Sequence, residues 1–422
     1  MTETPDRLIQ LVSAILFALA LVHTFAVKQF ERLSRRFPRH AGLFHLLGEV
    51  EVVFGFWAIL LVLAMALIGS PGRALEYAGS RQYAEPLFVF VIMVIAASRP
   101  VVRTIFAVTQ ALARKLPLPA PLATAWLGLA AVPLLGSLVT EPAAMTIAAL
   151  MLAPQIFREG IPEWLKYFAL GVLFVNVSIG GTMTTFAAPP VLMVADTWGW
   201  TSAFMLATFG WKAALAVLVN ASLAAVLLRP HLRARPHGPS GDDGAGVPPL
   251  VALLHFAFLG AAVVLAHHPV AFLAIFLMFL GFTQAYERHQ SPLILREALL
   301  VAFFLAGLVV LGGMQQWWLQ PLVGGMSPGV LFFGATALTA ITDNAALTYL
   351  GSLIEGISDQ ARYSLVAGAV AGGGLTVIAN APNPAGVALL RHGFADASIG
   401  AAGLLAGALV PTLVAVAAFT LL

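Results

Sequence analysis

The stretch Thr140-Glu141-Pro142-Ala143-Ala144-Met145-Thr146 places an acidic residue inside a long apolar run, and it recurs 202 positions later as Thr342-Asp343-Asn344-Ala345-Ala346-Leu347-Thr348. Each copy is followed by a segment that begins with Gly-Gly and contains Ala-Pro near its end, at residues 180–190 and 373–383. Apolar segments that Gly and Pro interrupt at matching places in two halves of a chain point to the binding site of a secondary transporter. The pattern therefore predicts an ion or solute carrier.

The composition of the chain is that of a polytopic membrane protein. Of its 422 residues, 60% are hydrophobic and 10% are charged, and the mean hydropathy is +0.93. A soluble globular domain carries about 25% charged residues. Because Cys is absent, disulfides, thiolate metal sites and cysteine nucleophiles are excluded. No Walker sequence, His-Glu-x-x-His or nucleophile elbow occurs, so the sequence predicts a transporter rather than an enzyme, with no cofactor.

The chain contains ten apolar runs that are long enough to cross a hydrocarbon core of about 30 Å. They lie at residues 8–27, 46–68, 85–102, 167–195, 203–228, 250–266, 269–286, 297–314, 363–389 and 399–422. The first run resembles a signal peptide in length, but acidic residues precede it and no small-x-small cleavage site follows it. A basic cluster comes directly after it, so we interpret it as a span with its N-terminus outside.

Two further apolar stretches, residues 121–157 and 328–354, are each interrupted midway by the Thr-acid motif and are predicted to be re-entrant hairpins. Basic residues flank the first hairpin on both sides, with Lys115 before it and Arg158 after it, so both of its ends should lie in the cytoplasm. The flanks of the second hairpin are poor in basic residues and suit the outside. The two hairpins are therefore expected to enter the membrane from opposite faces.

A linker at residues 230–249, rich in Pro, Gly, Ser and Asp, is predicted to be cytoplasmic and to divide the chain into two repeats. Each repeat, at residues 1–229 and 250–422, holds five spans and one hairpin. Because five is odd, the second repeat should be inverted relative to the first, as in alternating-access carriers. Gly180 and Gly373 differ by 193 positions, as do Pro189 and Pro382, which supports the repeat. The alternative is a chance match between two Ala-rich segments.

The two acidic residues of the motif are the strongest candidates for chemistry. A charged carboxylate near the bilayer centre costs about 2.5 to 3.5 kcal/mol by insertion scales, so it persists chiefly where it faces a cavity or a partner. Glu141 and Asp343 are expected at the hairpin tips, where free carbonyls of helix ends and the hydroxyls of Thr140 and Thr342 would complete an oxygen cage for Na⁺. The alternative for each acid is that it only caps the helix that follows.

The Gly-Gly breaks would free further carbonyls at membrane depth, which is tolerable where they line a cavity. Neutral side-chain oxygens accompany both breaks, although a simple packing kink is the alternative for either one. The predicted ion-binding residues are Thr140, Glu141, Thr184, Thr185, Asp343, Asn344, Thr376, Asn380 and Asn383.

Other polar residues of the apolar runs are less specific. Lys212 could neutralise a site carboxylate when the cation leaves, or could pair structurally with Asp196 or Glu141, and the structural role is favoured. Glu49 and Glu51 lie near the cytoplasmic end of the second span, where the basic loop before them offers partners.

The motifs together resemble the ion transporter superfamily, which groups arsenite, citrate and dicarboxylate carriers with NhaD-type sodium/proton antiporters. The segments that carry the resemblance are residues 48–57 (GEVEVVFGFW), 140–144 (TEPAA), 342–346 (TDNAA) and 379–383 (ANAPN). They resemble in particular a bacterial family of Na⁺/H⁺ antiporters, over nearly the whole chain. Carboxylate carriers of the superfamily have Ser-Asn-Thr at the tips, so the acids at Glu141 and Asp343 favour a cation. The resemblance also implies a homodimer with a scaffold and a moving domain.

The sequence therefore predicts a sodium/proton antiporter of the cell's inner (plasma) membrane, in which Glu141 and Asp343 bind either Na⁺ or protons. Competition at one site suffices for exchange, provided that the carboxylate has a pKa near the working pH. The expected partners are membrane lipids, a monovalent cation and the proton, and no nucleic acid. Two alternatives stay open at this point: a sodium-coupled carrier of a small anion, and a channel or membrane sensor that transports nothing.

Overall fold

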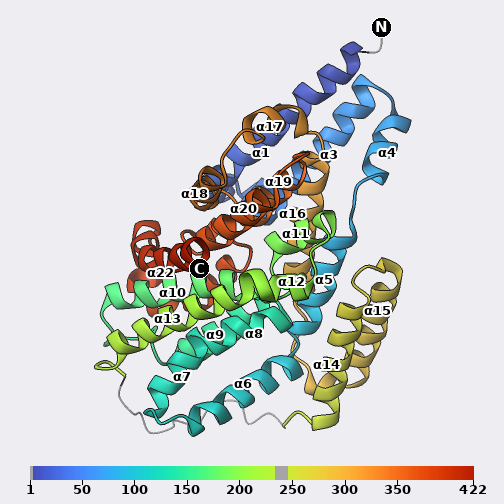
Figure 1. Ribbon diagram of the computed structural model, residues 1–422. Coiled ribbons are helices and arrows are strands. Elements are labelled where there is room, and N and C mark those ends of the chain that lie inside the picture. Colours follow the sequence, from blue (N-terminus) through green and yellow to red (C-terminus); the bar gives the residue numbers. More distant parts are fainter. Residues whose placement is uncertain (1–2, 233–245) are drawn as a thin grey trace. The chain divides into compact units, whose positions relative to one another are not determined.

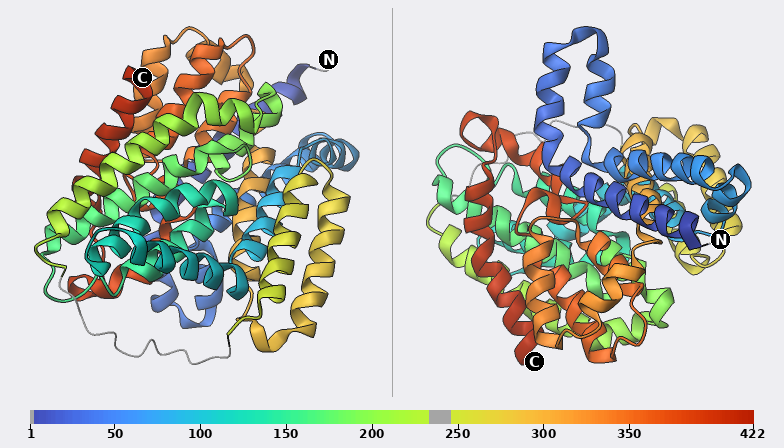
Figure 2. Two further views of the ribbon diagram at one scale, coloured as in Figure 1. Left: turned by 60° about the horizontal axis from the view of Figure 1, so that its bottom comes forward. Right: turned by 90° about the horizontal axis from the view of Figure 1, so that it is seen from above.

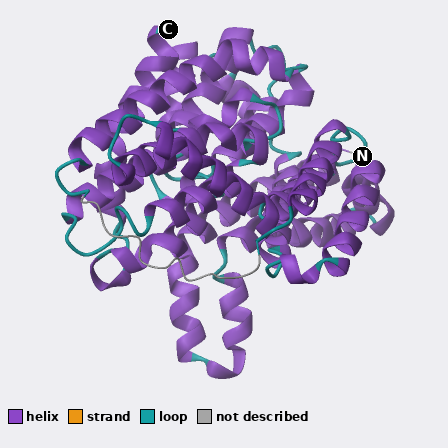
Figure 3. Ribbon diagram, turned by 90° about the horizontal axis from the view of Figure 1, so that it is seen from below, coloured by secondary structure: helices purple, strands orange, loops and turns teal. Residues whose placement is uncertain are grey.

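The computed structural model describes residues 3–232 and 246–422, and within these ranges it contains helices and loops and no strand (Figure 3). The predicted all-α class is confirmed for this part of the chain. Most of the predicted linker falls on residues 233–245, which lie outside the described residues.

The chain folds into two compact units, and each is described by itself. Unit 1 comprises Met1–Phe90, Leu295–Ser327 and Tyr349–Asp359, and unit 2 comprises Val91–Ile294, Pro328–Thr348 and Gln360–Leu422. Each unit thus draws on both halves of the sequence. The two units do not coincide with the two predicted repeats. The inverted repeat concerns membrane topology and stays a prediction.

The helices of each unit follow in chain order (Figure 1). Unit 1 contains α1 (Glu3–Arg36), η1 (Pro38–His40), α2 (Ala41–Leu47), α3 (Val50–Ile68), α4 (Pro71–Gly79), the start of α5 (Ala84–Ala96), α16 (Leu295–Gly312), α17 (Gln316–Val323) and the end of α19 (Asn344–Ser352). Unit 2 contains the end of α5, α6 (Arg99–Lys115), α7 (Ala120–Leu129), α8 (Ala131–Val139), α9 (Glu141–Leu152), α10 (Glu163–Gly180), η2 (Gly181–Met183), α11 (Pro189–Trp198), α12 (Ser202–Met205), the π-helix η3 (Leu206–Gly210), α13 (Trp211–Leu228), α14 (Pro249–Val264), α15 (Pro269–Ala285), η4 (Glu287–His289), α18 (Pro328–Thr339), the start of α19, α20 (Asp359–Gly372), η5 (Val377–Ala379), α21 (Asn383–Leu390), η6 (Arg391–Gly393), η7 (Ala395–Ala397) and α22 (Ala401–Leu421).

Unit 1 is organised around α3, which packs against α1 and α16. The helices α3 and α16 approach closely because both contribute glycine: a Cβ added at Gly307 would lie 2.3 Å from the backbone nitrogen of Gly55. At the start of α3, Glu49 forms an ion pair with Arg296 and lies 3.8 Å from His45. Glu49 thus has a basic partner in the segment before it, as predicted, and a second basic partner in α16.

Unit 2 is built around α10, whose segment Glu163–Met183 is 94% buried. It packs against α22 and α13 and against the helices of the first predicted hairpin, α8 and α9. A single apolar helix surrounded on all sides in this way is a core element rather than a lipid-facing one. The Gly180-Gly181 break at its end therefore opens inside the unit.

The first predicted hairpin, residues 121–157, forms the helices α7, α8 and α9, which pack against one another (Figure 1). α7 and α8 are bent by 41° relative to each other. The bend has a clear cause, because Pro133 lacks the N–H that would bond to the carbonyl of Leu129 in a straight helix. The chain reverses at Thr140, between the end of α8 and the start of α9.

The second predicted hairpin, residues 328–354, forms α18 and α19, joined by a turn at residues 340–343. Ala335 of α18 packs with Leu365 and Ala369 of α20, and Leu347 of α19 packs against this cluster. Both arms of the hairpin therefore pack against α20, the helix that precedes the second Gly-Gly break.

Within residues 3–232 and 246–422, six helices are long and apolar enough to cross a membrane, or up to eight if each bent pair is one span. The sequence predicts ten. The difference lies in α14 and α15, which form a hairpin of shorter helices (Figure 2), and in the predicted span at residues 363–389, which is split between α20 and α21. The structure thus supports a polytopic membrane protein.

Candidate ion-binding site

The tip of the first hairpin is strained. Thr140 lies between α8 and α9 with φ 98° and ψ 153°, although a β-branched residue rarely adopts positive φ. Such backbone costs on the order of 1–3 kcal/mol and is found mostly at functional sites, held by the structure around it. The packing around Thr140 therefore holds this residue in an unfavourable backbone conformation.

Glu141, the next residue, begins α9, and its side chain is completely buried. Its carboxylate oxygen Oε2 accepts a hydrogen bond from Asn380 Nδ2 at 2.8 Å, between residues 239 positions apart. Its other oxygen, Oε1, is buried and makes no hydrogen bond. The space for this carboxylate depends on the absence of a side chain at Gly181, where an added Cβ would lie 2.7 Å from Oε1.

Two oxygen atoms near this contact are also buried without a hydrogen-bond partner. They are Thr140 Oγ1 and Asn380 Oδ1. At the second break, the side-chain oxygens of Asn344 and Asn383 are also buried without a hydrogen-bond partner, and so is Asn344 Nδ2, a donor that a cation would not satisfy. About 90% or more of buried polar groups in proteins are hydrogen-bonded, so a group of unpaired oxygens needs an explanation. A hard cation that takes oxygen ligands would satisfy them.

The two asparagines Asn344 and Asn383 lie at the second Gly-Gly break. Asn383 Nδ2 donates to the carbonyl of Gly373 at 2.8 Å and to that of Thr376 at 2.9 Å. A Cβ added at Gly373 would lie 3.0 Å from Asn344 Nδ2 and 2.1 Å from Ser178 Oγ. The glycine therefore allows the two asparagines and α10 to converge on one unwound segment.

Asp343 is held differently from Glu141. Its oxygen Oδ1 accepts hydrogen bonds from the backbone N–H groups of Ala345 at 2.8 Å and Ala346 at 3.1 Å, so it caps the start of α19. The capping alternative considered for Asp343 is thus realised for this oxygen. Asp343 also lies close enough to Glu141 for their charges to interact. For Glu141 the carboxylate bonds to Asn380 instead, and α9 has no side-chain cap.

Two of the predicted threonines tie each unwound segment to its own hairpin. Thr184 Oγ1 donates to the carbonyl of Ser137 at 2.7 Å, and Thr376 Oγ1 donates to the carbonyl of Ala340 at 2.9 Å. In both cases the acceptor lies at the end of the first arm. Thr185 differs, because its N–H and hydroxyl both interact with Ser202 Oγ at 3.3 Å.

Ser137 is a site residue that the sequence interpretation missed. Its Oγ donates to the carbonyl of Gly180 at 2.6 Å and accepts from the N–H of Met183 at 3.0 Å, which fixes the break beside Glu141. A signal was available, because the offset of 202 between the tips pairs Ser137 with Thr339, another buried hydroxyl residue.

A buried pair of asparagines was also missed. Asn176 Nδ2 donates to the carbonyl of Leu129 at 2.8 Å, which Pro133 leaves without its helical partner, and to that of Val217 at 3.3 Å. Asn220 Nδ2 donates to Asn176 Oδ1 at 3.0 Å. Single asparagines in apolar helices form no spacing pattern in the sequence, so their pairing could not be predicted from it.

Lys212 does not pair with either of its predicted partners. Its Nζ donates to the hydroxyl of Tyr363 at 2.9 Å, and Asp196 interacts with His267 at 3.2 Å. The favoured structural role of Lys212 fits this contact, but the proposed partners Asp196 and Glu141 are wrong.

The π-helix η3, which immediately precedes α13, packs against η2 and so lies beside the first break.

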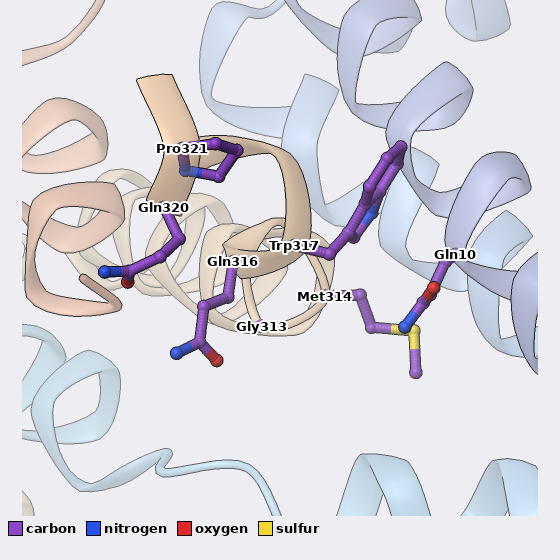
Figure 4. Close-up of a pocket in the computed structure, with 7 residues that line it drawn as sticks. All are labelled: Gln10, Gly313, Met314, Gln316, Trp317, Gln320 and Pro321. Carbon is purple, nitrogen blue, oxygen red and sulfur yellow. The ribbon is translucent and has the colours of Figure 1, made fainter. Parts of the chain in front are cut away.

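Two further features do not belong to this constellation. Among the described residues, no group of three or more His, Cys, Asp or Glu could hold a metal ion. A groove of about 490 Å³ in unit 1 is lined mainly by uncharged polar and apolar side chains, including Gln10, Met314 and Trp317 (Figure 4). It contains none of the predicted ion-binding residues.

The chain was also compared with known proteins. No curated protein matches it significantly. A family model described as "Putative Na+/H+ antiporter" matches residues 8–422, which is nearly the whole chain. The buried acid at a hairpin tip and the apolar helices agree with a membrane transporter of cations. The chain belongs to this Na⁺/H⁺ antiporter family.

Proposed function

We propose that this chain exchanges Na⁺ for H⁺ across the membrane and that Glu141 is the group that binds either ion. The observation that carries the proposal is a fully buried carboxylate with one oxygen bonded to a neutral amide and the other unpaired. An isolated charged carboxylate at that depth is costly, so it is stable when it has bound a proton or a metal cation. These are the two loaded states that an antiporter needs.

In the exchange step, Na⁺ approaches protonated Glu141, the O–H bond breaks, water from the open side takes the proton as hydronium, and the carboxylate takes the cation. Thr140 Oγ1, Glu141 Oε1 and Asn380 Oδ1 are the unpaired oxygens nearest the step, and Asn344 and Asn383 offer two more. Thr184 and Thr376 position the unwound segments through their bonds to the hairpins. Asp343 supplies a second negative charge that favours a cation over an anion.

Alternating access through an inverted repeat is part of the proposal. The bonds of Thr184 to Ser137 and of Thr376 to Ala340 support it, because in each half a threonine hydroxyl joins the broken segment to a carbonyl of its hairpin, at positions one residue out of register between the repeats. The anion-carrier alternative is disfavoured by carboxylates at both tips. We place the protein in the plasma membrane and keep the homodimer as a prediction, which the mass of the purified protein in detergent would test.

Flux measurements in proteoliposomes test the function. ²²Na⁺ uptake should follow an imposed pH gradient with no organic substrate present, and Glu141→Gln should abolish it. Asp196→Asn is the matched control, because it removes a carboxylate that is exposed and bonded to His267. Uptake by the Glu141→Gln variant at the wild-type rate would remove Glu141 from the mechanism.

The hairpin topology has its own test. Single cysteines at Lys115 and Glu159 should react with a membrane-impermeant reagent from the cytoplasmic side, and cysteines at Ser327 and Ser358 should react from the other side. Each can be introduced without background, since the chain contains no cysteine. Reaction at Lys115 and Glu159 from opposite faces would make the first hairpin a span and remove the inverted repeat.

A further inference from the structure

Two helices of unit 1, α3 and α16, form an apolar groove where they lie side by side (Figure 1). The groove has a volume of about 280 Å³ and runs along one face of α3, from Gly55 to Leu63, and one face of α16, from Phe303 to Val310. Both helices are long and apolar enough to cross a membrane. The part of α3 that lines the groove is about 12 Å long at 1.5 Å per residue. An elongated apolar recess between two such helices fits an extended hydrocarbon chain.

The recess exists because small residues lie between larger ones. A Cβ added at Gly307 would lie 2.3 Å from the backbone nitrogen of Gly55, so the two helices meet there backbone to backbone. Ala58 and Ala306 also line the groove, whereas the neighbouring Ile59 is 53% exposed. Two helices with large side chains at all of these positions would offer a lipid tail no such recess.

A positive charge lies at one end of the groove. Ala306 and Gly313 are seven residues apart and so lie on the same face of α16 and its extension. A Cβ added at Gly313 would lie 2.5 Å from Arg81 Nη1. The guanidinium carbon of Arg81 lies 4.5 Å from the ring centroid of Tyr77. The Tyr77 hydroxyl donates to the carbonyl of Val310 at 2.5 Å, so these contacts hold Arg81 where the groove ends.

The guanidinium of Arg81 keeps most of its hydrogen-bonding capacity. It has five N–H donors. Within residues 3–232 and 246–422 it makes one hydrogen bond, from Nη2 to Ser80 Oγ at 3.0 Å, and its Nε is buried without a partner. Ser80 and Tyr77 are uncharged and do not neutralise it. A phosphate group would accept two parallel hydrogen bonds from the guanidinium and supply the opposite charge.

Aromatic residues at this end of unit 1 indicate the level of the lipid headgroups. Tyr83 lines the groove, the hydroxyl of Tyr349 donates to the carbonyl of Val309 at 3.1 Å, and Trp317 lies in α17, which follows α16. Tyr and Trp are enriched where the hydrocarbon core meets water, and arginine side chains extend their charge to that level. The apolar groove and the charge of Arg81 therefore match the two parts of one phospholipid.

We propose that unit 1 binds one diacyl phospholipid of the bilayer, with an acyl chain in the groove between α3 and α16 and the phosphate at Arg81. A second copy of the chain, packed on the groove through an apolar helix, would leave the charge of Arg81 without a partner. The site contains none of the predicted ion-binding residues. Its occupancy can therefore be measured without a Na⁺ or pH gradient, and absence of antiport would leave the result unaffected.

A series of three ligands tests the site in the wild-type protein. Delipidated full-length protein in detergent is heated with phosphatidylglycerol, with diacylglycerol of the same acyl chains, or with glycerol phosphate. Phosphatidylglycerol should raise the midpoint of thermal unfolding by at least about 2 °C. Diacylglycerol lacks the phosphate and glycerol phosphate lacks the chains, so each should give less than half of that shift. No shift with phosphatidylglycerol, or an equal shift with diacylglycerol, would overturn the proposal.

Two substitutions test the two parts of the site separately. Arg81→Gln removes the charge, and Ala306→Leu fills the groove. Native mass spectrometry should show one retained phosphatidylglycerol on the wild-type protein and an apparent Kd at least about tenfold higher for either variant. Arg73→Gln is the matched control for the charge, because Arg73 pairs with Asp6. Ala257→Leu is the control for the added bulk, because Ala257 is exposed on α14 and lies outside the groove.

Both controls should bind the lipid as the wild type does. Equal lipid binding by Arg81→Gln, Ala306→Leu and the two controls would overturn the proposal. Conversion of a dimer to a monomer by Ala306→Leu would show that a second copy of the chain occupies the groove and would overturn it as well. The ligand series decides the question even where a variant fails to fold, because it uses the wild-type protein.

Discussion

Gly181→Ala tests whether the position of the Glu141 carboxylate matters to transport. An added Cβ would lie 2.7 Å from Glu141 Oε1 and 2.8 Å from its Cγ, well inside van der Waals contact. Contact at the usual separation of about 3.5 Å requires the side chain to move by roughly 0.8 Å. The backbone of Gly181 is helical, with φ −72° and ψ −9°, so alanine adds no conformational strain of its own. The displaced atoms belong to the Glu141 side chain, and the Cβ of Ala188, at 3.2 Å from the added Cβ, must also give way by a few tenths of an ångström, so the protein should still fold.

Displacing a reacting group by about 1 Å can cost a hundredfold in rate. We therefore expect pH-driven ²²Na⁺ uptake to fall by about 10- to 100-fold in Gly181→Ala, or about 1.4 to 2.7 kcal/mol in the transport barrier. Gly260→Ala in α14 is the matched control, because its Cβ would meet no atom within 4 Å. That change should leave uptake unaltered and raise stability by up to about 1 kcal/mol. Wild-type uptake by Gly181→Ala would show that transport does not depend on the position of the Glu141 carboxylate.

Two substitutions beside the site, and the pH dependence of Na⁺ binding, should also have measurable effects. Asn176→Ala leaves the Leu129 carbonyl buried without a donor, so the free energy of unfolding should fall by about 1–3 kcal/mol, seen as a lower midpoint in a thermal assay in detergent. Ser137→Ala removes both bonds to the break at Gly180 and Met183 and should reduce the maximal uptake rate more than it reduces stability; an unchanged rate would deny Ser137 a positioning role. If protons and Na⁺ compete for one carboxylate, the apparent Kd for Na⁺ should rise about tenfold for each unit of pH below the site's pKa and level off above it. A Kd that is constant from pH 6 to 9 would indicate separate sites.

The part of the fold that follows from local sequence was predictable. Thr-acid interruptions in apolar runs marked both turns, and the structure has Thr140 between α8 and α9 and Asp343 immediately before α19. The Gly-Gly pairs marked the ends of α10 and α20, because glycine is unfavourable in the interior of a helix. These signals act within a few residues and need no knowledge of the tertiary structure.

The rest depended on contacts between distant parts of the chain. Asn380 was predicted as an oxygen ligand, but its pairing with Glu141 joins residues 239 positions apart, and no local pattern fixes such a partner. Asn176 lies in an otherwise apolar helix, where its role is set by a carbonyl that Pro133 frees on another helix. The two acids looked equivalent in sequence, and only the geometry separated the cap at Asp343 from the uncompensated carboxylate at Glu141.

If Na⁺ and H⁺ share Glu141, the binding of Na⁺ must release a proton, and this release can be measured. Purified protein in weakly buffered detergent solution, with a pH indicator, is titrated with NaCl and, for ionic strength, with choline chloride. If Na⁺ and H⁺ share this carboxylate, about one proton should be released per Na⁺ bound at pH values well below the site's pKa, and about half a proton at the pKa. The Asp196→Asn variant should release the same amount, and Glu141→Gln should release none. Na⁺ binding without proton release in the wild type, or equal release from Glu141→Gln, would contradict a shared carboxylate.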